Sequence, residues 1–125
     1  MPAAAATAVR ALIVEDDPDA SDALAAVLRR EGYDVEQAAT MGEALVLLER
    51  GVLPQVVILD LKLPDANGAL LLRRVRRENL PVKVAVATAY PDAAAHPALQ
   101  RFPPDRVFTK PLDYDELMDW MAKLE

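Results

Sequence analysis

Hydrophobic residues cluster in five short runs. The segments that follow the first, second, third and fifth runs place apolar residues at helical spacing. The run that ends at Asp60 shows no alternation, which is typical of a strand buried on both faces. The segment at 33–38 alternates between apolar and polar residues, which indicates an edge strand. The predicted strands are 10–14, 33–38, 56–60, 82–87 and 106–109, and the predicted helices are 18–31, 41–50, 69–78, 92–100 and a last one after Asp113.

Helix starts and stops support these boundaries. Asp17 precedes a proline and is expected to cap the first helix, which should end at Gly32. Thr40 and Glu43 have the spacing of a capping box before the second helix, which is expected to stop at Gly51. The fourth helix is expected to be irregular, because the segment around it contains Pro97, Pro103 and Pro104. Each proline removes a backbone hydrogen-bond donor.

Strands that alternate with helices predict an α/β fold with a parallel sheet, right-handed crossovers and helices on both faces. The 125 residues suit one domain, which we expect to span residues 9–125 after a flexible tail of residues 1–8. The chain has no cysteine and no apolar run long enough to span a membrane. The net charge of −6 argues against direct nucleic-acid binding, so the basic run 73–77 is interpreted as the solvated face of a helix.

Polar residues follow four of the predicted strands. Glu15 and Asp16 come after the first strand, Asp60 ends the third, Thr88 follows the fourth and Lys110 the fifth. In a parallel sheet of order 2-1-3-4-5 these strand ends lie along one edge, and the first and third strands are neighbours. Three close carboxylates favour either a retained proton or a hard cation such as Mg²⁺. A lysine and a threonine beside them could bind a phosphoryl group, which a carboxylate can accept.

With these residues in place, the sequence resembles the receiver domain of bacterial two-component response regulators, from about Val9 to Leu124. The motifs that carry the resemblance are Glu15-Asp16, Leu59–Asp65 with Gly68, Thr88-Ala89 and Lys110-Pro111. The resemblance implies a single flavodoxin-like, doubly wound domain. It also implies that a histidine kinase or phosphotransfer protein phosphorylates Asp60. Such a domain is cytoplasmic, supports its own aspartyl phosphorylation and dephosphorylation, and is not a conventional enzyme.

The resemblance also assigns roles to the residues around Asp60. Asp16 would bind Mg²⁺ directly, Glu15 would act through a metal-bound water, and the backbone carbonyl of Lys62 would complete the metal site. Thr88 and the backbone amide of Ala89 would bind phosphoryl oxygens. Lys110 would pair with Asp60 or its phosphate, before a cis bond to Pro111.

The sequence departs from the family at the switch. The family couples the threonine, here Thr88, to an aromatic residue three positions before the lysine, but Val107 stands there. Phe108 is one place further on, and alternation along a strand should turn it to the other face. The proline-rich segment 96–105 replaces a regular fourth helix. We therefore expect a nonstandard and mobile output face.

Two other functions are compatible with this pattern. The first is a phosphorylation-independent interaction module of the same fold, suggested by Val107 and the interrupted fourth helix. The second is a phosphotransfer enzyme of the haloacid dehalogenase type, which also uses an aspartate nucleophile. That enzyme would need a second aspartate two residues after Asp60, where Lys62 stands, and normally a cap domain.

Overall fold

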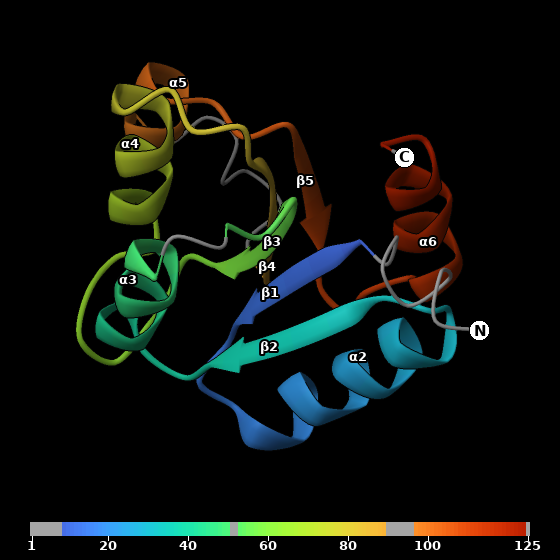
Figure 1. Cartoon of the computed structure of the whole chain (residues 1–125). Helices are drawn as coiled ribbons and strands as arrows, with labels where there is room; N and C mark the ends of the chain where they lie inside the picture. Colours follow the sequence, from blue (N-terminus) through green and yellow to red (C-terminus); the bar gives the residue numbers. More distant parts are fainter. Residues whose placement is uncertain (1–8, 51–52, 90–96, 125) are drawn as a thin grey trace.

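A computed structural model of the chain describes residues 9–50, 53–89 and 97–124. These residues form a five-stranded parallel sheet of order β2-β1-β3-β4-β5, with helices between the strands (Figure 1). The elements in chain order are β1 Arg10–Val14, α2 Pro18–Arg30, β2 Asp34–Ala38, α3 Met41–Glu49, β3 Val56–Asp60, α4 Ala69–Arg77, β4 Lys83–Thr88, α5 Pro97–Arg101, β5 Arg106–Thr109 and α6 Tyr114–Ala122. The predicted fold class, strand order and edge position of the second strand are confirmed.

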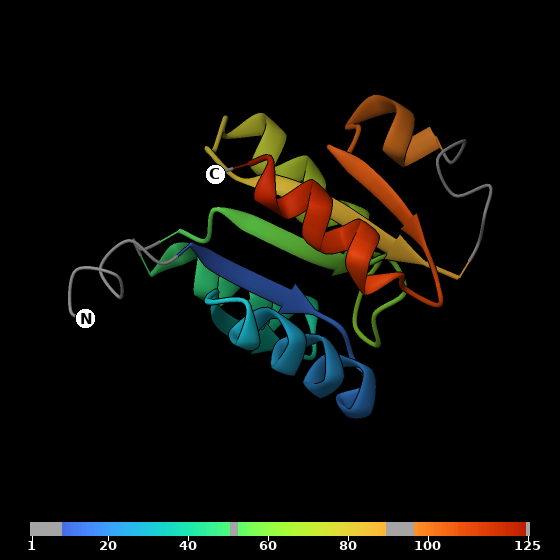
Figure 2. The same ribbon diagram turned by 90° about the vertical axis from the view of Figure 1, so that its right-hand side faces the viewer.

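The sheet separates two hydrophobic cores. Helices α3, α4 and α5 cover one face, and α2 and α6 cover the other (Figures 1 and 2). Alternate residues of each central strand enter opposite cores, so Leu12 and Val57 face the first core while Ile13 and Ile58 face the second. Burial on both faces explains the continuous apolar runs of these strands. Figure 2 shows that β1, β3, β4 and β5 point the same way, so their carboxyl ends meet at one edge of the sheet.

The predicted helix caps are present. Asp17 accepts a hydrogen bond from the Asp19 amide at 3.1 Å. Gly32, with φ of +93°, lies just past the C-cap of α2, in a conformation that favours glycine. Thr40 caps α3, with its hydroxyl oxygen 3.1 Å from the Glu43 amide nitrogen.

Only the last part of the predicted fourth helix lies in the described residues. This part, α5, is a short helix from Pro97 to Arg101, so its end lies within one residue of the predicted end at Gln100. Pro103 and Pro104 follow soon after this end, where proline cannot continue a helix. The tail 1–8, the helix stop at Gly51 and the 92–96 part of the predicted helix lie outside the described residues.

Strand β5 turns its two central side chains to opposite faces, as alternation predicts. Phe108 is buried against α6, where its ring meets that of Trp120 edge to face at 5.9 Å. Val107 packs on the other face, against the core beneath α3, α4 and α5. The aromatic ring of β5 is therefore on the face away from α5. Across the described part of the chain, no helix has the length and hydropathy needed to cross a membrane.

Candidate functional site

Asp60 ends β3 at the carboxyl edge of the sheet, next to Ala87 of β4. Its carboxylate is 14% exposed and has a different donor on each oxygen. The Lys62 amide donates to Oδ1 at 3.0 Å, and the Lys110 ammonium donates to Oδ2 at 3.3 Å. These two hydrogen bonds fix the orientation of the carboxylate at the edge of the sheet, with the Lys110 ammonium beside it.

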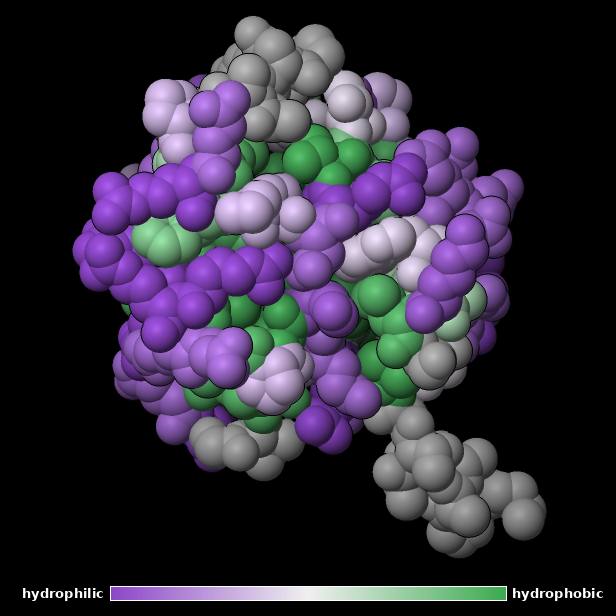
Figure 3. Space-filling view, turned by 90° about the horizontal axis from the view of Figure 1, so that it is seen from above, coloured by the Kyte–Doolittle hydropathy of each residue, from purple (hydrophilic) through white to green (hydrophobic). Residues whose placement is uncertain are grey.

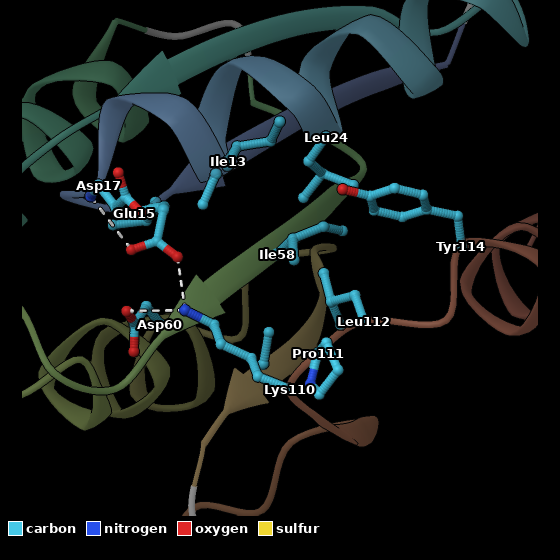
Figure 4. Close-up of a pocket in the computed structure, with 13 residues that line it drawn as sticks. Ile13, Glu15, Asp17, Leu24, Ile58, Asp60, Lys110, Pro111, Leu112 and Tyr114 are labelled. Atoms are coloured by element: carbon cyan, nitrogen blue, oxygen red, sulfur yellow. Dashed lines mark hydrogen bonds and ion pairs between the residues drawn. The ribbon is translucent and has the colours of Figure 1, made fainter.

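Lys110 joins the ends of β1 and β3. Its Nζ also donates to Glu15 Oε1 at 2.5 Å, across 95 positions of sequence (Figure 4). Carboxylate oxygens of Glu15, Asp16 and Asp60 lie within 4.8 Å of one another. Glu15 is nearly buried, whereas Asp16 is exposed to solvent. The strand order thus brings together four of the side chains that the sequence predicts for the site.

Charge within this cluster is not balanced, because one ammonium faces three carboxylates. Burial has the largest effect on the pKa of Glu15 and raises it above its ordinary value. The hydrogen bond from Lys110 acts in the opposite direction, and the nearby carboxylate of Asp60 raises the pKa further. Burial disfavours the charged form of Lys110, but its hydrogen bond to Glu15 and the negative charges of Asp60 and Glu15 outweigh this effect and raise the pKa of Lys110. The cluster therefore favours additional positive charge.

The residues fit a hard divalent cation. All three side chains are oxygen donors, which Mg²⁺ prefers, and the exposure of Asp16 leaves room for water ligands. The donor set contains neither histidine nor cysteine, the ligands of softer metals. A contribution from the carbonyl of Lys62 stays a prediction.

A cavity of about 450 Å³ opens above Asp60. It is lined by Asp16, Asp60, Lys62, Thr88, Ala89 and Lys110, together with the segment 61–64. Thr88 is buried at the end of β4, and its carbonyl accepts from the Lys110 amide at 2.7 Å. Lys110 is followed by a cis peptide bond to Pro111. Every predicted site residue except Glu15 and Val107 therefore lines this cavity, and Glu15 contacts Lys110 from the side.

A second cavity, of about 280 Å³, lies beside the cluster between α2 and α6 (Figure 4). Its walls are mainly apolar and include Ala20 and Leu24 from α2, Leu112 from the segment before α6, and Tyr114 at the start of α6. It shares Glu15, Asp60 and Lys110 with the charged cluster, so an apolar groove leads directly to Asp60.

Sequence reasoning missed one residue that organises the loop after Asp60. The Asp65 carboxylate accepts the Met41 amide at 2.9 Å and the Gly42 amide at 3.0 Å, at the start of α3. These bonds to the Met41 and Gly42 amides hold the pKa of Asp65 below its ordinary value. Asp65 follows Pro64, and both are common turn residues, so the sequence indicates only a turn at this position. No local signal could reveal a bond to amides 23 and 24 positions away.

Gly68 closes the same loop against the backbone of Asp60. Its amide donates to the Leu61 carbonyl at 2.7 Å. A Cβ atom at this position would lie 2.4 Å from the Asp60 carbonyl oxygen. Glycine is therefore required here by the close approach of two backbone segments, which positions the chain that follows Asp60.

Comparison with known proteins places this arrangement in a family. Residues 11–122 match the response regulator receiver domain family. The chain is 31% identical over 112 residues to sporulation initiation phosphotransferase F from Bacillus subtilis, covering 90% of each protein. It is 33% identical over 110 residues to the transcriptional regulatory protein TrcR from Mycobacterium tuberculosis, covering 88% of this chain and 42% of that protein. The chain thus spans less than half the length of this second relative.

Solved structures agree in fold. A receiver domain protein from Methanospirillum hungatei superposes with a TM-score of 0.83 at 32% identity, covering 94% of each chain. The response regulator protein TrrA from Thermotoga maritima, solved in complex with Mg²⁺ and BeF, gives a TM-score of 0.84 at 28% identity, covering 94% of this chain and 99% of that one. On its sequence match, its strand order and its acidic edge, the chain belongs to the response regulator receiver domain family of two-component signalling.

Proposed function

We propose that the chain is a phospho-receiver in which Asp60 accepts a phosphoryl group from a phosphohistidine of a histidine kinase or phosphotransfer protein. The observation that carries this proposal is the placement of Asp60. Its carboxylate borders a cavity of about 450 Å³, with the Lys110 ammonium at 3.3 Å and the oxygens of Glu15 and Asp16 within 4.8 Å.

The reaction is a phosphoryl transfer between two side chains. A carboxylate oxygen of Asp60 attacks phosphorus, the bond from phosphorus to the imidazole nitrogen of the donor breaks, and that nitrogen keeps the electron pair. Little else is required of the protein than alignment and neutralisation of the charge on the phosphoryl oxygens. We assign that neutralisation to the Lys110 ammonium, the Thr88 hydroxyl and the Ala89 amide, because all three residues line the cavity.

The acidic cluster would hold Mg²⁺, with Asp16 and Asp60 as direct ligands, Glu15 acting through water, and the carbonyl of Lys62 completing the site. Bound Mg²⁺ would neutralise the acceptor carboxylate and the approaching phosphoryl oxygens. The raised pKa of Glu15 supports this assignment, since it reflects an excess of negative charge in a desolvated place.

The groove between α2 and α6 is where we propose that the phosphodonor docks. Its apolar walls, with Ala20 and Leu24 on one side and Leu112 and Tyr114 on the other, end at Asp60 (Figure 4). Tyr114 is 37% exposed and lies across the groove from α2. A helix of the donor that carries the phosphohistidine could lie along this groove and present its imidazole to the cavity.

After transfer, we propose that Thr88 moves toward the phosphoryl group and that the surface around β5 changes its partner affinity. Val107 is half-buried on the α5 side of β5, so it is the side chain of that strand positioned to respond. The partner is either an output domain or a separate downstream protein. Transcriptional regulators among the relatives support the first possibility.

The test is intact-protein mass spectrometry after incubation with acetyl phosphate, with and without Mg²⁺. We expect a gain of one phosphoryl group that requires Mg²⁺ and is lost in Asp60→Asn. Asp19→Asn, an exposed change of the same charge at the start of α2, should leave the gain intact. A wild-type protein that gains no phosphoryl group from acetyl phosphate or a phosphohistidine donor, and binds no Mg²⁺ by calorimetry, would support the phosphorylation-independent module instead.

A further inference from the structure

A groove separates α4 from α5, on the side of the sheet away from the phosphodonor groove. Its volume is about 360 Å³. The side chains that define its character are Leu70, Arg73 and Arg77 from α4, and Arg101 and Phe102 from the end of α5. All of the charged residues in its lining are arginines. We call this surface the arginine groove.

The arginines of the basic run 73–77 divide into two pairs. Arg74 forms ion pairs with Glu49 and Glu78, and Arg76 pairs with Asp105 at 3.0 Å. By contrast, Arg73, Arg77 and Arg101 are exposed, and none of the ion pairs among the described residues includes them. Carboxylates of α4 and of neighbouring segments therefore pair with Arg74 and Arg76, whereas Arg73 and Arg77 face the groove, in a chain whose net charge is −6.

Phe102 holds two of these charges in place. The guanidinium carbon of Arg77 lies 5.7 Å from the centre of its ring, and that of Arg101 lies 5.5 Å from it. Stacking on a ring limits the freedom of an arginine side chain and keeps its donors available. Two cations that share one ring also repel each other, and a bound anion would relieve that repulsion. The arrangement is thus prepared for a negatively charged ligand.

The groove also has an apolar component. Leu70 is 49% exposed, one of the most exposed large hydrophobic side chains in the described residues. Leu70, Arg73 and Arg77 follow one another at helical spacing along α4, so an apolar contact lies at one end of a cationic stripe. Figure 3 shows hydrophilic side chains framing small hydrophobic areas over the part of the surface that α4 and α5 form.

From this combination we propose that the arginine groove binds an acidic amphipathic peptide segment of a partner protein. Carboxylates one helical turn apart would pair with Arg73, Arg77 and Arg101, and an apolar side chain between them would contact Leu70 and Phe102. Recognition of an amphipathic helix in a groove between two helices has this general form. A nucleic acid fits less well, because a long polyanion would meet the repulsion of an acidic chain and would gain little from Leu70.

The proposal does not depend on phosphorylation of Asp60. The groove lies across the sheet from the α2–α6 groove, and its charged side chains are separate from the acidic cluster. An Asp60→Asn variant should therefore bind the peptide as the wild type does. This separates a failure of the docking proposal from a failure of the phospho-receiver proposal.

The test is a titration of isotope-labelled protein with a synthetic helical peptide, followed by amide chemical shifts. The peptide carries glutamates at i, i+3, i+4 and i+7 around two leucines, and its counterpart carries lysines instead. We expect the acidic peptide to shift amides of α4 and α5, and the lysine peptide to leave them unchanged. Arg77→Glu with Arg101→Glu should weaken binding roughly tenfold or more, because two attractive contacts become repulsive.

Two controls address alternative explanations. Arg30→Glu, an exposed reversal on α2, should leave binding within about twofold, and thermal unfolding should show that all variants are folded. Leu70→Ala should weaken binding without affecting the fold, because the side chain is half exposed. Absence of shifts at α4 and α5, or equal binding of both peptides, would overturn the proposal. The proposal would also be overturned if a single-stranded oligonucleotide bound this groove more tightly than the acidic peptide, or if the groove were buried in a dimer of this chain.

Discussion

Gly68→Ala adds a single methyl group, which should displace the backbone of Asp60, eight positions earlier in the sequence. The added Cβ would lie 2.4 Å from the Asp60 carbonyl oxygen, 3.0 Å from Leu61 Cα and 3.2 Å from the Asp60 carbonyl carbon. These are backbone atoms, so no flexible side chain can move aside. Carbon and oxygen atoms normally approach no closer than about 3.3 Å, which means that the two segments must separate by about 1 Å.

The cost of this separation can be estimated. Overpacking of this kind costs about 1–3 kcal/mol, and the loss of unfolded-state freedom on replacing glycine by alanine offsets about 0.4–1 kcal/mol of it. The Gly68 amide also donates to Leu61 at 2.7 Å, and separation would lengthen this bond. We expect a loss of about 1–2 kcal/mol in the free energy of unfolding. Because the displaced atoms belong to Asp60 and Leu61, phosphorylation by acetyl phosphate should slow as well.

Urea denaturation of the wild type and the variant measures the first effect, and a time course of intact mass measures the second. Gly42→Ala is the matched control: its Cβ would lie 3.7 Å from Asp65 Oδ2 and 3.8 Å from Thr40 Oγ1, which are ordinary contacts. Gly42 lies within α3, so alanine there should stabilise the protein by up to about 1 kcal/mol. A Gly68→Ala variant that matches the wild type in both stability and phosphorylation rate, or equal destabilisation of both variants, would refute a steric conflict at Gly68.

Three further predictions concern charge and packing. Asp65 has a lowered pKa in the folded protein, so its ionised form contributes stability above the unfolded pKa of about 4, and that stability is lost as the pH falls through the lower folded value. Urea denaturation should therefore show a stability difference between the wild type and Asp65→Asn that is constant near neutral pH and shrinks below pH about 4. A difference independent of pH would contradict this. Mg²⁺ should raise the melting temperature of the wild type and of Asp19→Asn but not that of Asp16→Asn, because binding to the folded state alone stabilises it; an equal rise in all three would exclude Asp16 as a ligand. Phe108→Leu should lower the unfolding free energy by about 1 kcal/mol through loss of the edge-to-face contact with Trp120, measured by urea denaturation, and a double-mutant cycle with Trp120→Leu should show coupling between the two rings.

Much of the fold was predictable because its signals are local. The central strands are buried on both faces, which produces continuous apolar runs, and the helix caps at Asp17, Thr40 and Asp113 use side chains that bond to amides within three positions. The end of the fourth helix also had a local signal, because Pro103 and Pro104 follow it and its described part ends at Arg101.

The clustering of the site was predictable from topology. Once the strand order is known, the ends of β1, β3, β4 and β5 lie along one edge, with β1 beside β3. The long side chain of Lys110 then reaches from the end of β5 to Asp60 and Glu15. Contacts made by loops were not predictable. Asp65 bonds to α3 through a path set by the whole β3–α4 connection.

The basic run 73–77 could be interpreted only in part from sequence. Its position on a helix and the acidity of the chain indicate a solvated face, and that holds for each of its arginines to some degree. Which arginines find carboxylates depends on Glu49 and Asp105, residues of other elements. The stacking on Phe102 likewise depends on α5. The groove is therefore a product of tertiary structure, which the sequence pattern does not contain.

The central claim is that Asp60 carries the phosphoryl group. Borohydride reduces an aspartyl phosphate to homoserine, so reduction after incubation with acetyl phosphate and Mg²⁺ leaves a permanent mark on the acceptor. Tandem mass spectrometry of the digested protein then locates that mark. We expect homoserine at position 60, dependent on Mg²⁺ and absent from Asp60→Asn. Homoserine at another aspartate, or at none, would contradict it.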